Sequence, residues 1–441
     1  MNPQRFLRLV SGAMAALGIS AAAIVALNLR GEDPLPSAET LKPTPALVAQ
    51  GEYLTRVGNC MACHTVQGGA PFAGGRGIET PFGVVYSSNL TPDKATGLGA
   101  WTSAEFWRAM HNGRGKDGRL LYPAFPYTSY THVTREDSDA IFAYLQSLPP
   151  VAQANKAHAL RFPYSTQAAL GVWRALFFTP ADVAQPAASA PQALATAQVP
   201  DYQRGAYLVN GLGHCAACHT PRNSLGAEQQ GQALAGGLIP VQNWLAPALT
   251  DAGQAGVQRW PQADVVALLK TGVAPQASVI GPMAEVVFRS TQYLSDADAR
   301  AMAVYLQALP QHAATPAKQA VAPASVMERG AKVYEAQCAQ CHGAQGQGAK
   351  DEAGQPAFPA LAGNRAVVLA DPTNLVRVVL QGGYLPATAG NPRPHGMPPF
   401  QHLLGDEDVA AVATFVRNSW GNQAAGVGTI EVYRARERRS P

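Results

Sequence analysis

All six cysteines of the chain lie in three copies of one short motif, Cys-x-x-Cys-His. The copies are Cys60, Cys63 and His64; Cys215, Cys218 and His219; and Cys338, Cys341 and His342. This motif is the attachment signature of c-type haem. Two thiols on one helical turn bond the porphyrin edge, and the adjacent imidazole reaches the iron. The sequence therefore predicts three haem c groups, with the cysteines as covalent attachment sites and the three histidines as iron ligands.

Two other uses of paired cysteines are disfavoured by spacing and context. Zinc ribbons place their Cys-x-x-Cys pairs roughly 15–20 residues apart. Here more than a hundred residues separate one pair from the next. A thioredoxin-like thiol pair needs a βαβ context, which the sequence lacks.

Each haem iron needs a group on its second face, and Met/His ligation is typical of electron-carrying cytochromes c. Met283 follows Gly272 by eleven residues, and Met397 follows Gly383 by fourteen. Both methionines lie beside proline in Gly/Pro-rich segments that follow a predicted middle helix. A methionine that only fills a core has no reason to recur at that place, so we predict both as distal iron ligands.

The first unit departs from this pattern, because Phe125 stands twelve residues after Gly113, where a methionine is expected. Phenylalanine cannot bind iron. The nearest alternatives are Met110, whose other role would be packing on the haem face, and His111, whose other role would be that of a surface histidine. An open or water-ligated iron is the third possibility.

Repeats in the sequence predict a mostly α architecture of three tandem haem domains. Each unit opens with a helix that runs into the motif, contains a middle helix, and closes with a helix at 137–150, 296–310 or 406–421. Ala/Pro-rich stretches between the units are typical of linkers. The predicted boundaries are 1–30 for an anchor or signal, 31–48 for a linker, 49–178 for domain 1 with an extension, 179–200 for a linker, 201–311 for domain 2, 312–326 for a linker, 327–425 for domain 3 and 426–441 for a tail.

The segment from Leu9 to Leu29 is uncharged, apolar and about long enough to span a bilayer as a helix. The apolar core of a signal peptide is about 7–15 residues and ends at a cleavage site between small residues. This run is longer and ends in Asn-Leu-Arg, which favours an uncleaved transmembrane anchor. Arg5 and Arg8 precede it, so the positive-inside rule leaves the N-terminus in the cytoplasm and the haem domains in the periplasm.

A second apolar segment, 164–178, has a helical period and no counterpart in the other units. We expect it to brace domains 1 and 2 or to face a partner. The formal net charge of +4 gives no electrostatic footprint for nucleic acid. A dinucleotide-binding G-x-G-x-x-G after a strand is also absent, so nothing predicts that the chain itself oxidises an organic substrate.

From residue 49 to 425 the chain resembles the triheme cytochrome c subunits of bacterial membrane-bound periplasmic dehydrogenases, which act on alcohols, gluconate, sorbitol and related sugars. The motifs that carry this resemblance are GEYLTRVGNCMACHT, AGGRGIETPFGVVYSSNLTPD, LYPAFPYTSY, GPMAEVVFRSTQYLSDADARAMAVYL, MPPF and VATFVRNSWGN. The family pattern implies the same haem cysteines and proximal histidines, with Met283 and Met397 as distal ligands. In two respects the chain differs. Phe125 resembles the cytochrome subunits of nicotinate- or isoquinoline-type molybdenum hydroxylases, and the membrane-associating tail of some relatives is missing from the sequence.

The predicted function is electron transfer. A dehydrogenase catalytic subunit of quinoprotein, flavoprotein or molybdenum type would pass electrons to the three haems, which deliver them to ubiquinone or a terminal oxidase at the inner membrane. Two alternatives stay open: peroxidase-like activity at an open first haem, and a free-standing multihaem carrier without a fixed partner.

Overall fold

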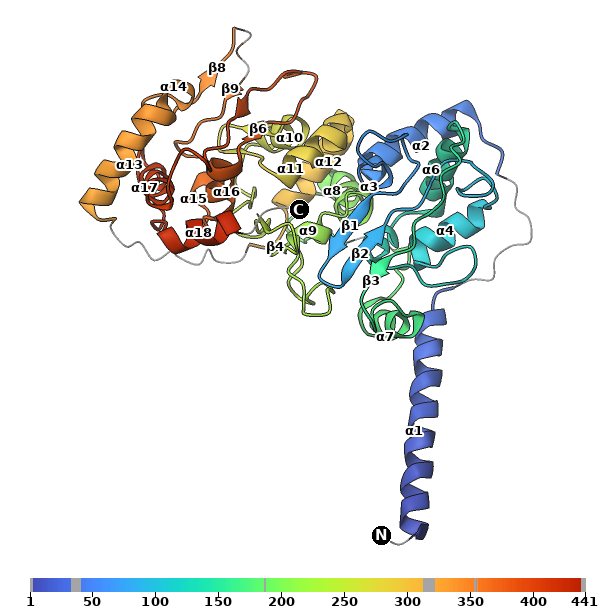
Figure 1. Ribbon diagram of the computed structural model, residues 1–441. Coiled ribbons are helices and arrows are strands. Elements are labelled where there is room, and N and C mark those ends of the chain that lie inside the picture. Colours follow the sequence, from blue (N-terminus) through green and yellow to red (C-terminus); the bar gives the residue numbers. More distant parts are fainter. Residues whose placement is uncertain are drawn as a thin grey trace. The chain divides into compact units, whose positions relative to one another are not determined.

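The computed structural model of the chain describes residues 3–32, 41–185, 188–311, 322–352, 354 and 356–437. These residues form two compact units. The first contains Met1–Thr55, Cys60–Gln185 and Ser224–Ala227, and the second contains Arg56–Asn59, Pro186–Asn223 and Glu228–Pro441. The first unit therefore holds most of the first motif repeat, and the second unit holds the other two repeats (Figure 1).

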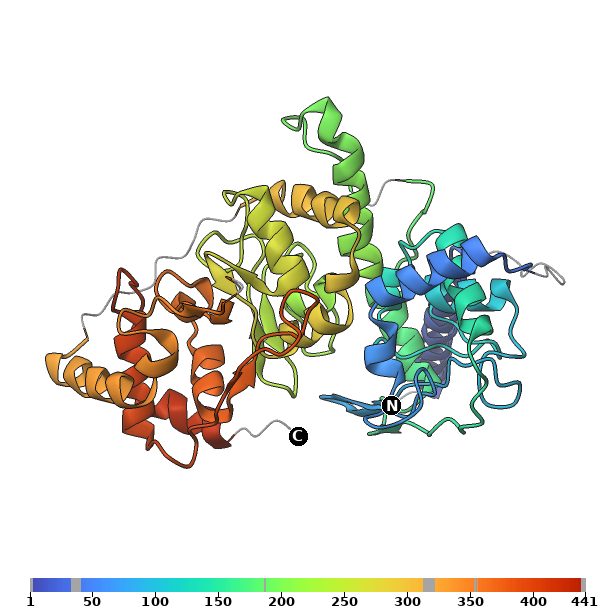
Figure 2. The same cartoon turned by 90° about the horizontal axis from the view of Figure 1, so that it is seen from above.

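The first unit is a set of helices with one small antiparallel sheet. Its helices are α1 (Pro3–Leu29), α2 (Pro45–Val57), α3 (Cys60–His64), α4 (Ser103–Asn112), α5 (Tyr127–Tyr130), α6 (Arg135–Ser147) and α7 (Gln167–Phe177). The sheet has the order β1 (Gly77–Thr80), β2 (Gly83–Tyr86) and β3 (Ala159–Leu160), with Gly77 opposite Tyr86. Helix α1 leaves the unit as a single rod and is seen almost end-on in Figure 2.

The second unit repeats the helical pattern twice, with two-residue and three-residue strand pairs in the loops. Its helices are α8 (Val199–Tyr207), α9 (Ala216–His219), α10 (Gln262–Thr271), α11 (Pro282–Arg289), α12 (Asp296–Gln307), α13 (Ala324–Gln337), α14 (Ala339–His342), α15 (Arg365–Val368), α16 (Thr373–Gln381), α17 (Asp406–Arg417) and α18 (Thr429–Glu437), with short η1 (Thr196–Gln198), η2 (Leu208–Leu212) and η3 (Thr291–Tyr293). Its strands are β4 (Gly237–Ile239), β5 (Trp244–Ala246), β6 (Val273–Ala274), β7 (Ala277–Ser278), β8 (Ala349–Lys350), β9 (Pro356–Phe358), β10 (Gly383–Tyr384) and β11 (Gly396–Met397). The prediction of a mostly α fold is confirmed.

One glycine per repeat lets the opening and closing helices cross at close range. A Cβ on Gly51, Gly205 or Gly330 would lie 1.8, 2.0 or 2.3 Å from the carbonyl oxygen of Ala140, Ala301 or Ala411. No side chain fits at such a distance, so glycine is required in all three helices. This crossing fixes the direction in which each opening helix delivers its motif.

Several predicted boundaries differ from the observed ones. Helices α2, α8 and α13 begin at Pro45, Val199 and Ala324, before the domain starts predicted at 49, 201 and 327. The middle helix α16 ends at Gln381 and is capped by Gly382, with φ 74°, rather than by Gly383. The predicted linkers 31–48, 179–200 and 312–326 lie partly outside the described residues.

The predicted tail 426–441 is wrong over its described part. Residues 429–437 form α18, in which Val432 and Ala435 are buried against the core formed by α16 and α17. Arg436 also pairs with Asp406 at 2.8 Å. The segment is therefore a structural part of the third repeat.

Helix α1 is the one described helix long and apolar enough to cross a membrane, over Val10–Leu29. A signal sequence near the N-terminus shares these features. Cleavage after α1, as in a signal sequence, would remove the contacts that its C-terminal end makes with the rest of the first unit.

Candidate functional site

The three Cys-x-x-Cys-His motifs each form a short turn of helix, which is α3, α9 or α14. In every copy the histidine is the last helical residue, and the loop that follows returns past its imidazole ring. The same local geometry therefore occurs three times, although the residues around the motifs differ.

Each motif histidine is oriented by a backbone carbonyl from that returning loop. The Nδ1 atom of His64 lies 2.7 Å from the oxygen of Ser88, that of His219 lies 2.7 Å from Pro247, and that of His342 lies 3.0 Å from Pro359. A carbonyl can only accept, so Nδ1 must carry the proton. The Nε2 atom of each ring then presents a lone pair, which is what an iron ligand requires.

Burial also keeps these imidazoles neutral. It lowers the pKa of His64, His219 and His342, while the hydrogen bond to the carbonyl opposes the shift in part. A neutral ring with a fixed tautomer binds a metal without first losing a proton. The sequence did not reveal the three carbonyl partners.

The paired thiols do not have the character of a redox pair. Burial raises the pKa of Cys60 and Cys215 to about 12 and that of Cys338 to about 11, and the second cysteine of each motif acts in the same direction. Reactive cysteines of disulfide oxidoreductases have a lowered pKa instead. Protonated thiols beside an oriented imidazole fit a covalent haem attachment site.

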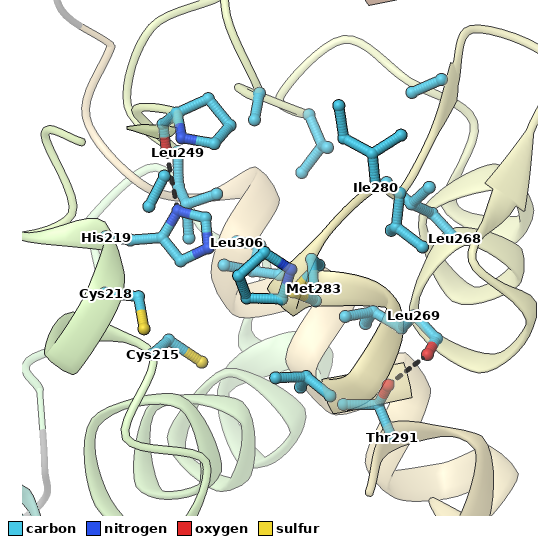
Figure 3. Close-up of a pocket in the computed structure, with 18 of the residues that line it drawn as sticks. Cys215, Cys218, His219, Leu249, Leu268, Leu269, Ile280, Met283, Thr291 and Leu306 are labelled. Atoms are coloured by element: carbon cyan, nitrogen blue, oxygen red, sulfur yellow. Dashed lines mark hydrogen bonds between the residues drawn. The ribbon is translucent and has the colours of Figure 1, made fainter. Parts of the chain in front are cut away.

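A mostly apolar cavity lies directly against the second motif. Cys215, Cys218 and His219 line it on one side, and Met283 lies on the side opposite His219 (Figure 3). Met283 is near the start of α11, where Pro282 fixes the first turn. The cavity thus has His219 and Met283 in its lining, the two residue types that a Met/His-ligated haem requires.

The remaining walls of this cavity are mostly apolar and are partly supplied by the third repeat. Leu268, Leu269 and Leu306 cover it from α10 and α12, whereas Leu369 and Asn374 come from the region of α15 and α16. Asn374 donates to the Leu245 carbonyl at 2.7 Å and accepts from the Leu245 amide at 2.9 Å. This shared wall was not predicted, because the sequence does not indicate which loops of different repeats meet.

A buried guanidinium lies beside this shared wall. Arg377 of α16 is positioned over the ring of Trp244, 4.7 Å from its centroid, and Trp244 also lines the cavity. Burial lowers the pKa of Arg377, and its side chain donates to Gln381. A positive charge at this position suits a cofactor that carries acidic groups.

Met397 lies in β11, which pairs with β10 so that Met397 stands opposite Gly383. Its side chain is half-buried and packs against a core that includes Val376, Leu380 and Phe400. Both methionines therefore follow the middle helix of their repeat, although Met397 lies in a short strand and Met283 in the first turn of α11. Its role as an iron ligand stays a prediction.

In the first repeat, aromatic rings occupy the segment that corresponds to the Met283 region. The Phe125 ring lies 5.4 Å from that of Tyr130 and 6.5 Å from that of Tyr127. Burial raises the pKa of Tyr130 well above its usual range, and negative charge on Cys60 or Cys63 acts in the same direction. Tyr130 is therefore within electrostatic reach of the first motif.

The two alternative ligands of the first site lie on adjacent positions of α4. Met110 corresponds to Leu269, which lines the second cavity, so the repeat favours a position facing the first motif. His111 is 7% exposed, and the prediction that it would otherwise be a surface histidine is wrong. Its ring stacks on Trp107 at 4.5 Å, and its Nδ1 atom lies 3.5 Å from the hydroxyl of Thr131.

Comparison with known proteins gives one family and several close relatives. The family model for cytochrome c matches residues 48–149, 202–310 and 327–420. The cytochrome c subunit of quinone-dependent alcohol dehydrogenase from Gluconacetobacter polyoxogenes is 38% identical over 92% of this chain and 87% of its own. The gluconate 2-dehydrogenase cytochrome c subunit of Pantoea cypripedii is 40% identical over 88% of each chain. A nicotinate dehydrogenase subunit of Pseudomonas putida is 40% identical over 85% of this chain and 30% of its own.

Proposed function

Since the chain belongs to the cytochrome c family, and within it to the cytochrome c subunits of bacterial dehydrogenases, we propose that it transfers electrons through three covalently bound haem c groups. The observation that carries the number three is the repeated imidazole geometry. His64, His219 and His342 each have Nδ1 against a backbone carbonyl and Nε2 left for a metal.

The residues of the chain would hold each haem in a defined way. Cys60, Cys63, Cys215, Cys218, Cys338 and Cys341 bind the porphyrin edges covalently. The three histidines would be iron ligands, and Met283 and Met397 would be the second ligands of the second and third haems. When bound, the haem supplies one-electron redox chemistry, and the protein fixes its orientation and excludes water.

The arrangement in the second unit supports electron passage between the second and third haems. The wall of the second cavity contains residues of the third repeat, and the paired hydrogen bonds between Asn374 and Leu245 hold the two repeats together. Arg377 at this wall would stabilise the acidic groups of a bound haem. Protein atoms of both repeats would then form the wall between the two haems.

The electron donor proposed here is a dehydrogenase catalytic subunit of quinoprotein, flavoprotein or molybdenum type. The relatives carry names of dehydrogenases for alcohol, gluconate and nicotinate, so the names favour a donor of this kind without selecting its substrate. The proposed acceptor is ubiquinone or a terminal oxidase. Helix α1 would anchor the chain in the inner membrane with the haem domains in the periplasm.

The number of haems is tested directly by a haem-to-protein ratio and by the intact mass of the purified chain. We expect three covalent haems per chain. Replacing both cysteines of one motif, as in C60A/C63A, C215A/C218A or C338A/C341A, should leave two haems in each case. A wild-type ratio of two, or a double variant that still carries three, would contradict the proposal.

The partner is tested by purification of the tagged full-length chain from membranes and identification of the large subunit that copurifies with it. A dehydrogenase whose substrate reduces the haems of the complex supports the proposed role. If the chain purifies alone and no dehydrogenase reduces it, a free-standing carrier replaces the dehydrogenase subunit as the proposed function.

A further inference from the structure

Helix α7 buries its charged residue and exposes apolar side chains, which is the reverse of the pattern in a helix at a water-facing surface. Its one charged residue, Arg174, is 3% exposed, whereas Val172 and Leu176 are 43% and 60% exposed. Ala168, Val172 and Leu176 are four residues apart and therefore share one face. A surface helix in water normally carries its charged residues on this face.

The turn that precedes α7 extends the same kind of surface. Phe162 is 84% exposed, the most exposed of the large apolar side chains among the described residues, and Tyr164 is also exposed. Hydrogen bonds from Ser165 to Arg161 and from Thr166 to Pro163 make this turn compact. We call Phe162, Tyr164, Ala168, Val172 and Leu176 the apolar platform.

The platform lies where α1 meets the rest of the first unit. Helix α7 lies across the end of α1 (Figure 1), and the two helices pack at Gly171, where a Cβ would be 3.9 Å from both Ile24 and Asn28. Asn28 donates to the Gly171 carbonyl at 2.9 Å and accepts from Arg174 Nε at 3.0 Å. The row Ala168–Val172–Leu176 is adjacent on the helix surface to the row that contains Gly171.

The end of α1 is held by a buried polar cluster and is part of the folded unit. Arg174 donates from Nη1 to the carbonyl of Asn112 at 2.6 Å, and Asn112 donates to the carbonyl of Gly31 at 3.0 Å. Arg114 pairs with Glu32 at 2.6 Å and also donates to the carbonyl of Asn28. Removal of α1 near residue 31 would leave Arg174 without Asn28, which argues for retention of the helix.

We propose that the apolar platform inserts into the headgroup and acyl boundary of the membrane that α1 crosses, so that α1 and α7 together seat the first haem domain on the lipid surface. This inference rests on the proposed membrane location of α1. A helix that lies across the end of a spanning helix lies along the bilayer plane, and its exposed apolar face can then meet lipid. Arg161 beside Phe162 is exposed, and its guanidinium donates to the carbonyl of Pro81.

Lipid is favoured over a protein partner by continuity with α1. The same helix that carries Val172 and Leu176 contacts α1 through Gly171 and Arg174, so a bilayer around α1 must end close to α7. Aromatic side chains such as Phe162 and Tyr164 are typical of the membrane–water interface. A protein partner would need a second interface beside that bilayer.

The test uses the full-length haem-loaded chain in vesicles of phosphatidylethanolamine and phosphatidylglycerol that contain a phospholipid with a photoreactive acyl chain. After illumination, lipid adducts are mapped by peptide mass spectrometry. We expect adducts on α1 and on residues 162–176. The double variant V172E/L176E should lose the adducts on 162–176 at least several-fold while it keeps those on α1, and Glu136→Gln on the exposed start of α6 should change neither.

The outcomes separate this inference from the proposed anchor. Adducts confined to α1 would overturn the platform and leave the anchor intact. Absence of adducts on both segments, with the chain in the supernatant, would overturn both. Adducts on 162–176 in a chain whose N-terminus begins near residue 31 would overturn both the anchor and the joint seating by α1 and α7, because lipid would then contact the platform without α1. If V172E/L176E loses haem and does not fold, Phe162→Glu in the exposed turn replaces it.

Discussion

The first and second motif sites share one side and differ on the other. On the histidine side, His64 and His219 make the same 2.7 Å contact from Nδ1 to a carbonyl of the returning loop. On the opposite side, the second site has the thioether of Met283 across an apolar cavity, whereas the first repeat has Phe125 packed near Tyr127 and Tyr130. The orientation of the motif histidine is therefore the same in the two repeats, and the proposed haems would differ in redox properties through the distal face.

The largest loss of haem is expected from substitutions at the glycines where the opening and closing helices of each repeat cross. A valine at Gly205 would bring its Cβ to within 2.0 Å of the Ala301 carbonyl, and one at Gly51 to within 1.8 Å of the Ala140 carbonyl. Helices α8 and α12, or α2 and α6, must then move apart, at a cost of about 3 kcal/mol or more. We expect G51V and G205V each to lose most of the haem of its own domain, measured as haem per chain.

The control for this pair is Gly390→Val, at a glycine with open space around it. It should retain three haems and the wild-type unfolding temperature. If G51V and G205V behaved like this control, the helix crossing would not be the shared framework of the two sites.

The next effect concerns the distal face of the second site. Met283→Leu keeps the volume and apolar character of the side chain but removes the sulfur, so the second haem should lose its thioether ligand. Axial ligands set haem potentials over a wide range, and we expect a fall on the order of 0.1 V. The measurement is a spectroelectrochemical titration together with the sulfur-to-iron charge-transfer band.

Met302→Leu is the matched control, because Met302 also lines this cavity but belongs to the closing helix α12. It should leave both the band and the potential unchanged. Because the haem bound by Met397 also contributes to the band, M283L should reduce its intensity by about half, and a band reduced in M302L but unchanged in M283L would reverse the assignment of the ligand.

A smaller effect is expected when the first site is made to resemble the second. Phe125→Met introduces a thioether where the repeat predicts a ligand, and the potential of the first haem should rise by roughly tens of millivolts if its iron accepts it. Tyr127 and Tyr130 surround this position, whereas the second site has an apolar cavity. The rise in potential in F125M should therefore be smaller than the fall in M283L. Phe125→Leu, which removes the ring without adding sulfur, should raise no potential.

The sequence predicted the histidine side of the sites better than the distal side. The motif residues are contiguous, so their roles follow from one helical turn. Their carbonyl partners at Ser88, Pro247 and Pro359 lie 24, 28 and 17 residues away. These partners are backbone oxygen atoms, which any residue can provide, so no residue pattern predicts them.

The errors in the fold have a similar origin. The segment after 426 is rich in arginine and was predicted as a tail, yet Val432 and Ala435 are three residues apart and bury one face of α18. Two buried residues are too few to give a clear helical period. For His111 the alternative to an iron ligand was a surface histidine, but its ring stacks on Trp107, which has no counterpart in the second repeat, where the equivalent position is Val266.

The smallest effect is expected from substitution of His111. This experiment decides whether His111 only packs in the first repeat or binds the iron of the first haem. His111 stacks on Trp107, and Met110 occupies the position of cavity-lining Leu269. If His111 has only a packing role, His111→Gln should leave the spectrum and potential of the first haem unchanged and lower the stability of its domain by about 1 kcal/mol, the value of an aromatic pair. Thermal unfolding and low-temperature EPR of the oxidised protein measure the two quantities. Loss of a low-spin EPR signal in H111Q, with the same signal retained in Met110→Leu, would instead identify His111 as the iron ligand and make the first haem a bis-histidine centre.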